Sequence, residues 1–157
     1  MRSNIQEKLI IRKARREDVP AIVQLLARDP LGKTREIATD PLPDAYYSAF
    51  QAIEDDPNQF LAVMERDGRI IGTLQLSFIA GLSRLGSMRA QVEAVHIDEA
   101  FRNQGLGEYF MQWCVTQAKN RRCSLLQLTT DKTRKDAHRF YERLGFVATH
   151  EGMKLRL

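Results

Sequence analysis

The order of apolar patterns along this 157-residue chain predicts an α/β (α+β) fold. Three strand-like stretches follow one another before residue 98, which indicates antiparallel neighbours. Beyond them, stretches with helical spacing alternate with short apolar runs. The length, with 43% hydrophobic and 28% charged residues, predicts one domain over residues 1–157 with a substantial core.

The first elements are expected to be a short strand and two helices. Lys8–Ala14 is apolar at its centre and predicts a strand. Asp18 is a suitable N-cap, with Pro20 in the first turn, for a helix that ends at residues 29–32. A second helix is expected at Asp44–Ile53. The apolar stripes that define the two helices are Val19, Ile22, Val23 and Leu26, then Tyr46, Ala49, Phe50 and Ile53.

The connection between these helices, Leu31–Pro43, is the least periodic part of the chain. A variable connection after the first helix is a natural place for a substrate wall. Tyr46 and Tyr47 are the nearby residues best suited to line a pocket, although most such helical stripes are simply core.

A hairpin and a third strand are expected next. Phe60–Met64 and Arg69–Phe78 flank Asp67-Gly68, a dipeptide that favours the tight turn. Gly72 inside the second strand indicates a bulge or a close backbone approach. A loop with two glycines leads into the third strand, Met88–Ile97. The later elements are a helix at Gly105–Lys119, a strand at Ser124–Thr130, a helix at about Lys135–Leu144 and a final strand at Phe146–Leu155.

Composition argues against several classes of protein. No run reaches the length of a membrane span, and the charged start is unlike a signal peptide. Cys114 and Cys123 lack metal-ligand spacing, so we expect no metal and a reducing cytoplasm. Cys114 lies on the apolar face of its helix and is expected to be a small buried hydrophobe.

The positive charge is unevenly distributed. Of the net +4, residues 81–157 carry 13 Lys and Arg against 8 Asp and Glu. A basic half suits a multiply anionic ligand, although basic surfaces are common. Nucleic-acid binding is not expected, because the basic residues are not interleaved with aromatic ones and no reading motif is present.

The stretch Gln91–Glu108 combines a strand, a glycine-containing turn and a helix start. The unpaired amides and the positive dipole end of a helix N-terminus favour an anion there. Glycine also lets the backbone approach a ligand closely. The stretch therefore predicts a phosphate-binding device.

Three known phosphate-binding loops are compatible with a glycine turn before a helix, and the spacing of the motif residues distinguishes them. The P-loop needs Lys-Ser or Lys-Thr after its glycines, and neither follows Gly107. The dinucleotide fingerprint needs a third glycine where Phe110 stands. The remaining pattern, Arg102-x-x-Gly105-x-Gly107, resembles the acetyl-CoA pyrophosphate loop, [RQ]-x-x-G-x-[GA], of the Gcn5-related N-acetyltransferases (GNAT).

A second stretch carries the same resemblance. Ala137, Phe140, Tyr141 and Leu144 form one helical face, and Gly145 follows as a C′ cap before a phenylalanine. The pattern A-x-x-F-Y-x-x-x-G-F is similar to the second GNAT motif and lies at the expected distance after the loop. The resemblance covers nearly the whole chain, from about residue 8 to residue 154.

The resemblance implies a mixed, strongly twisted sheet of six to seven strands flanked by about four helices. It also implies that two middle strands splay apart to admit the pantetheine arm of acetyl-CoA. The backbone of Val95 and Ile97 would pair with that arm as an added strand does, while both also serve as strand core. The residues implied to wrap the pyrophosphate, largely through main-chain N–H groups, are Arg102, Asn103, Gln104, Gly105, Leu106 and Gly107.

Acetyl transfer to an amine needs a base and an acid. A free alkyl amine has a pKa of about 10 and must lose a proton, and the leaving thiolate of CoA must gain one. Tyr141 matches the family's general acid, although it would also serve as a half-buried structural tyrosine. Glu93 is the candidate base, because strand parity puts it on one face with Val95 and Ile97, although it would equally serve as an ordinary paired carboxylate. A bulge would undo that parity, which otherwise turns His96 the opposite way.

One position departs from the family's pattern. Relatives commonly carry Asn three residues before Ala137, where it contacts CoA, and this chain has Arg134. Arg134 or Lys135 is expected either to reach a phosphate or to lie in solvent.

The resemblance therefore implies an acetyl-CoA-dependent N-acetyltransferase that acts on a primary amine, by direct transfer in a ternary complex. A small-molecule acceptor is favoured over a protein amino group. The alternative is a sensor or scaffold module that binds acyl-CoA without turnover. No nucleic-acid or membrane partner is expected, a homodimer is compatible with the sequence, and the acceptor amine stays open.

Overall fold

The structure, a computed structural model, describes residues 8–157. The chain forms two compact units that divide between Gln127 and Leu128. The first unit holds the sheet and the helices that cover it, and the second holds helix α5 (Lys135–Arg143). Within residues 8–157, no helix has both the length and the apolar character that a membrane crossing requires.

The sheet has five strands in the order β1-β2-β3-β4-β5. The first four pair antiparallel in sequence order. The β4 and β5 strands run the same way, because Ser124 hydrogen-bonds to Met88 O and Gln127 bonds to Gln91. The sheet is therefore mixed, as predicted. The strand bounds are Leu9–Lys13, Gln59–Arg66, Arg69–Ala80, Met88–Ile97 and Cys123–Leu128.

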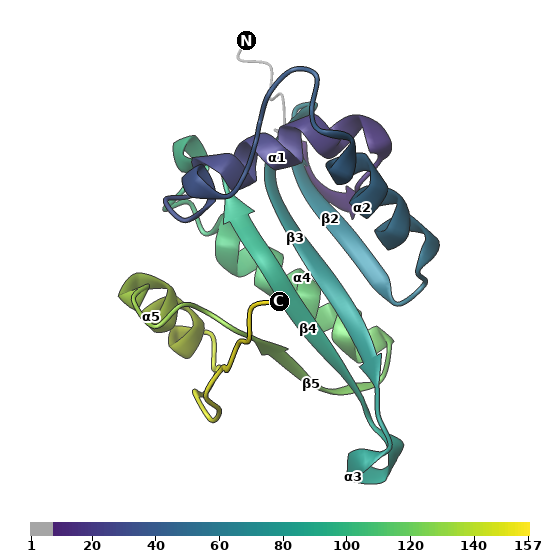
Figure 1. Ribbon diagram of the computed structural model, residues 1–157. Coiled ribbons are helices and arrows are strands. Elements are labelled where there is room, and N and C mark those ends of the chain that lie inside the picture. The colour runs from purple at the N-terminus through teal and green to yellow at the C-terminus, as the bar shows by residue number, and fades with distance from the viewer. Residues whose placement is uncertain (1–7) are drawn as a thin grey trace. The chain divides into compact units, whose positions relative to one another are not determined.

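Helices cover both faces of this sheet. The pair α1 (Val19–Arg28) and α2 (Asp44–Asp55) lies on one face, and α4 (Leu106–Asn120) lies on the other (Figure 1). On the α1 and α2 face, both predicted helical stripes pack toward the sheet. The buried cluster there consists of Ala14, Val19, Ile22, Val23, Leu42, Phe50 and Val63.

The predicted helix at Gly105–Lys119 is confirmed as α4, with Cys114 on its buried face. Its buried side chains are Leu106, Phe110, Met111, Cys114 and Ala118. Trp113 packs against Phe60 of β2, with ring centroids 5.3 Å apart. Cys114 is fully buried, and burial raises the pKa of its thiol to about 12, so it is a hydrophobe in the core and not a nucleophile.

The predicted hairpin is also confirmed. Asp67 and Gly68 both have positive φ, at 50° and 81°, as a two-residue turn of this kind requires. The β2–β3 register shifts between Met64 and Glu65, which makes a bulge beside Gly72. A Cβ at Gly72 would come within 2.8 Å of Ile97 Cδ1, so glycine there permits a close approach of β4.

The short helices lie in connections. Three 3₁₀ turns, η1 (Arg16–Asp18), η2 (Gly32–Thr34) and η3 (Glu99–Phe101), adjoin α1 and the end of β4. The four-residue α3 (Ser83–Gly86) lies inside the predicted loop between β3 and β4.

Asp18 precedes α1 as predicted, but it does not cap helix amides through its side chain. Its buried carboxylate accepts hydrogen bonds from Arg12 and from the Arg15 amide, both at 2.7 Å. Burial opposes the charge, yet these bonds outweigh it and hold the pKa of Asp18 below its ordinary value.

The predicted final strand at Phe146–Leu155 is wrong. Residues 146–157 form neither helix nor strand. Met153 and Leu155 are 94% and 87% exposed, so this segment has no buried apolar face to hold it in a ladder. The described sheet therefore has five strands, fewer than the six to seven expected.

Candidate functional site

Strand β4 contains a bulge at the centre of the predicted site. Thr73 pairs with His96 and Gln75 pairs with Glu93, so that one residue between these pairs on β3, Leu74, faces two on β4, Ala94 and Val95. Ala94 takes a positive φ of 50° within the bulge. An extra residue in one strand re-aims the side chains beside it.

The bulge overturns the predicted parity of Glu93. Thr73 and Gln75 are two residues apart on β3, so they share a face, and their β4 partners His96 and Glu93 share it with them. Ile97 instead points at Gly72 and the Met64 side of the sheet. The expectation that Glu93 shares a face with Ile97, with His96 on the opposite face, is therefore wrong. Glu93 and His96 lie on the α1 and α2 face.

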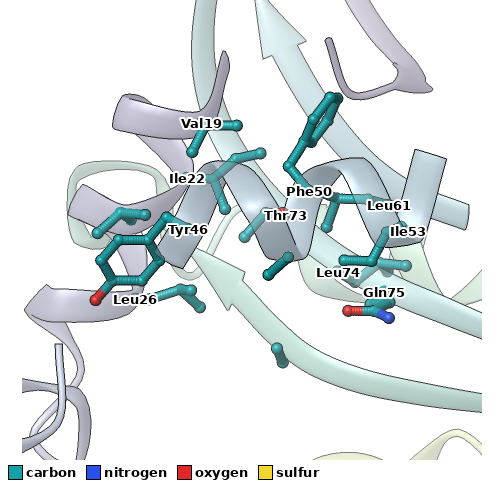
Figure 2. Close-up of a pocket in the computed structure, with 13 residues that line it drawn as sticks. Val19, Ile22, Leu26, Tyr46, Phe50, Ile53, Leu61, Thr73, Leu74 and Gln75 are labelled. Carbon is teal, nitrogen blue, oxygen red and sulfur yellow. The ribbon is translucent and has the colours of Figure 1, made fainter. Parts of the chain in front are cut away.

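An apolar cavity of about 150 Å³ opens on this same face (Figure 2). Both predicted helical stripes line it, as does Ala94 of the bulge. Tyr46 was expected to line a pocket and does so, whereas Tyr47 lies under the guanidinium of Arg16 instead. The lining residues are Val19, Ile22, Val23, Leu26, Tyr46, Ala49, Phe50, Ile53, Leu61, Thr73, Leu74, Gln75 and Ala94.

The few polar atoms of this lining are largely committed to the protein. Thr73 donates its hydroxyl to Ala62 O at 3.0 Å. The Tyr46 hydroxyl donates to Glu36 at 2.8 Å, accepts from the Ile37 amide, and points away from Phe50 in Figure 2. Burial is the main reason that the pKa of Tyr46 lies above its usual value. The tyrosine thus presents an apolar ring to the cavity.

A carboxamide, that of Gln75, and a carboxylate, that of Glu93, lie where the cavity meets β4. Gln75 donates its amide to Gln59 at 2.9 Å, which leaves its carbonyl oxygen as an acceptor. Glu93, its β4 partner, is exposed and accepts a hydrogen bond from Gln91 at 3.2 Å. A carboxylate at the bulge is therefore reachable by a small ligand from solvent.

The turn after β4 has the geometry of an anion site. Gly105 has φ 75°, and the first hydrogen bond of α4 runs from the Tyr109 amide to Gly105 O at 3.0 Å. The amides of Leu106 and Gly107 precede that bond, at the positive end of the helix dipole. Asn103 also has positive φ, at 59°. The predicted loop residues are thus gathered in one turn.

Side chains hold this turn in place. Arg102 donates from Nε to Ile97 O at 3.3 Å and pairs with Glu99 at 3.5 Å. Gln104 accepts a hydrogen bond from Arg66 at 3.2 Å. The Arg66 guanidinium lies 5.4 Å from the ring centroid of Phe101.

Asp98 anchors the start of the turn. Its carboxylate is 6% exposed and accepts hydrogen bonds from Arg69 at 2.7 Å, from Arg28 at 3.2 Å and from the Ala100 amide at 3.1 Å. Burial opposes the charge, but these three donors hold the pKa of Asp98 below its ordinary value. One carboxylate thus joins α1, β3 and the end of β4.

Arg28, Arg66 and Arg69 were not predicted as site residues. The strand register brings the hairpin arginines to Phe101, with Arg69 5.3 Å from the ring centroid. They add positive charge beside the anion-binding turn. The sequences of β2 and β3 give no local sign that Arg66 and Arg69 lie near Phe101, because this contact depends on pairing across the sheet.

The second unit carries the remaining predicted residues. Arg134 is the N-cap of α5, and its amide donates to Asp131 O at 3.0 Å. Tyr141 is half-buried on α5 and meets the rings of Phe140 and Phe146 edge-on, at 5.1 and 5.7 Å. Gly145 has φ 93° and ends the helix as predicted.

Comparison with known proteins identifies relatives. The Acetyltransferase (GNAT) family matches residues 19–146. Aminoalkylphosphonate N-acetyltransferase of Salmonella typhimurium is 25% identical over 150 residues, which are 95% of this chain and 92% of that protein. Glucosamine 6-phosphate N-acetyltransferase of Trypanosoma brucei brucei is 30% identical over 90 residues, 57% of this chain and 59% of that protein.

A solved structure of a transcriptional regulator from Bacillus halodurans C-125 has the same fold. It is similar with a TM-score of 0.93 at 45% identity, over 96% of this chain and all of that one (100%).

Asp98→Asn is expected to lower the free energy of unfolding at pH 7 by about 1–3 kcal/mol, because Arg28 and Arg69 lose their shared anion. A carboxyl with a lowered native pKa stabilises the fold above its ordinary pKa, and that contribution is lost as pH falls through the native pKa. The gap between wild type and variant should therefore close below pH ~4. Urea unfolding across pH measures it.

Glu99→Gln is the matched control, because the carboxylate of Glu99 is close to Asp98 in sequence but 68% exposed, and its ion pair with Arg102 is also solvent-accessible. It should change stability by less than about 0.5 kcal/mol. Equal losses in the two variants, or a gap that persists at acid pH, would contradict the anchoring role of Asp98.

Proposed function

Since this chain belongs to the GNAT acetyltransferase family, whose members are acetyl-CoA-dependent N-acetyltransferases, we propose that it acetylates a primary amine of a small molecule, by direct transfer in a ternary complex. The observation that carries the proposal is the cavity that ends at the β4 bulge, beside the carboxylate of Glu93. The relatives named for aminoalkylphosphonate and glucosamine 6-phosphate also point to small amines. Free cysteines suit a cytoplasmic enzyme.

Acetyl-CoA is proposed to bind along the end of β4 and the turn that follows. The backbone of Val95 and Ile97 would pair with the pantetheine arm as an added strand does. The amides of Gly105, Leu106 and Gly107 would bind the pyrophosphate at the helix start. Arg102, Asn103 and Gln104 complete the turn, and Arg134 is proposed to reach a phosphate in place of the usual asparagine contact.

Glu93 is proposed as the base, directly or through a water. Its assignment now rests on its place at the bulge and on the cavity face, and no longer on strict strand alternation. The carboxylate would take the proton of the ammonium, so that the neutral amine attacks the thioester carbonyl. His96 lies on the same face, with Nδ1 3.7 Å from the Asp29 carboxylate at the end of α1.

Tyr141 is proposed as the acid that protonates the leaving thiolate. As the C–N bond forms, the C–S bond breaks and the sulfur of CoA takes the phenolic proton, and the proton that the acylated nitrogen loses returns to the phenolate, directly or through water. The edge-on rings of Phe140 and Phe146 fix the direction of the tyrosine ring. Cys114 is fully buried and takes no part, so no covalent acetyl-enzyme is expected.

An acyl-CoA-binding module without turnover is the main rival. A panel of primary amines with acetyl-CoA should give amine-dependent release of CoA thiol, with intersecting initial-rate plots as a ternary complex requires. Parallel plots would indicate a covalent intermediate and contradict direct transfer. Tight acetyl-CoA binding without thiol release for any small amine or amino-terminal peptide would favour the rival.

Gly105→Val is expected to weaken acetyl-CoA binding about 100-fold or more, since a β-branched residue resists φ 75° and its side chain would displace the pyrophosphate from the turn. Isothermal titration calorimetry measures the dissociation constant. Gly86→Val is the matched control, because Gly86 has a similar φ of 70° in the distant α3 turn. Tight acetyl-CoA binding by the Gly105 variant would contradict the proposal that this loop binds the pyrophosphate.

Tyr141→Phe is expected to lower kcat about 100-fold, because the ring packing stays while the proton donor is lost. The dissociation constant for acetyl-CoA should change less than about twofold, since the phenol would act on the leaving sulfur and not on the bound ground state. Steady-state kinetics and calorimetry on the same preparation give both values. Unchanged turnover would remove Tyr141 from the chemistry.

A further inference from the structure

We infer that the acceptor is an amine that carries one compact apolar group, of about the size of a benzene ring, and no phosphate or phosphonate. The inference deepens the proposed function and rests on it. It differs from the acceptors for which the two curated relatives are named, an aminoalkylphosphonate and glucosamine 6-phosphate. The cavity at the bulge carries it.

The size of the cavity sets the size of the group. Apolar cavities of about 150 Å³, lined by side chains such as leucine, isoleucine and phenylalanine, stay dry and bind benzene. The cavity here has that volume, and Leu26, Ile53 and Leu61 are among its lining residues (Figure 2). A single ring or a short branched alkyl group therefore matches the volume of the cavity.

The residues that line the cavity determine whether the bound group of the acceptor can be charged. Among the 13 residues that line the cavity, all within the described chain, none is Lys, Arg, Asp or Glu. The hydroxyls of Thr73 and Tyr46 already hydrogen-bond to the protein. A phosphate buried here would lose its hydration without gaining a partner, which is strongly unfavourable. The basic residues near the turn, Arg66 and Arg69, belong to the proposed CoA site.

The position of the amine follows from the polar end of the cavity. Gln75 lines the cavity next to Ala94, and its carbonyl oxygen can accept an N–H bond. Glu93 is the register partner of Gln75 and supplies a negative charge for an ammonium. An apolar group in the cavity would thus place its amine at the bulge, one residue from the Val95 backbone, which is proposed to pair with the pantetheine arm that carries the acetyl group.

Ala49 offers a way to close the cavity without touching its polar end. It lines the cavity from α2, yet it is exposed, so a larger side chain can be accommodated without disturbing the core. Ala52 is also exposed on α2 and is not part of the lining. The pair Ala49→Phe and Ala52→Phe therefore adds the same ring to the same helix, inside and outside the cavity mouth.

Initial rates of thiol release at saturating acetyl-CoA test the inference on the wild-type chain. The three probes are 2-phenylethylamine, ethylamine and 2-aminoethylphosphonate, which share one aminoethyl unit. We expect kcat/KM for 2-phenylethylamine to exceed both others by at least about 30-fold, because burial of the ring is realised in the transition state. Equal or higher kcat/KM for the phosphonate would overturn the inference and leave the proposed function standing.

The two alanine variants provide a second test of the inference. Ala49→Phe should raise KM for 2-phenylethylamine at least about tenfold, with KM for acetyl-CoA changed less than about twofold. Ala52→Phe should change neither, and thermal unfolding checks that both variants fold. An unchanged KM for 2-phenylethylamine in a folded Ala49→Phe variant would place the ring elsewhere. Acetyl-CoA binding without turnover of any probe or other amine would instead contradict the proposed function.

Discussion

The bulge at Ala94 is the constraint on which the rest of the site depends. One extra residue in β4 breaks the alternation of the strand and takes a backbone conformation that alanine rarely adopts. Its effect is to turn Glu93 and His96 toward α1 and α2 while Ile97 stays with the opposite core. The same residue forms part of the cavity wall. The strand proposed to hold the cofactor arm therefore also borders the pocket proposed for the acceptor.

The two sides of the bulge, the cavity and the turn before α4, are held by different kinds of interaction. Apolar side chains of α1, α2 and β2 shape the cavity, and hydrogen bonds remove most polar atoms from it. On the other side of the bulge, Asp98 and the arginines that surround it fix the turn where α4 begins. An apolar pocket and a basic, amide-lined turn thus meet along one strand. That contrast suits a reaction between an apolar amine and a highly charged thioester.

Local features of the sequence predicted much of this site, and pairing between strands decided the rest. Gly105 with positive φ and Tyr46 in the cavity wall follow from glycine spacing and helical periodicity, which act within a few residues. The bulge was not predicted, because alanine carries no sign of a left-handed conformation. Strict alternation along the strand then placed Glu93 on one face with Ile97, which is wrong.

Long-range contacts account for the other differences. Asp98 meets Arg28 across 70 residues of sequence and Arg69 across 29, so only the folded sheet shows that it is an anchor. The final segment has apolar residues at alternating positions, but Met153, Leu155 and Leu157 there are exposed, so alternation alone did not make it a strand. Burial and a neighbouring strand are needed as well.

The central claim is that the cavity at the bulge receives the acceptor. The most direct measurement is a methyl NMR titration of the ¹³C-labelled chain, saturated with CoA, with 2-phenylethylamine. The largest shift changes are predicted at methyl groups of Ile22, Leu26, Ile53 and Leu61, which line the cavity. Saturable changes confined to methyl groups outside the lining would contradict the claim.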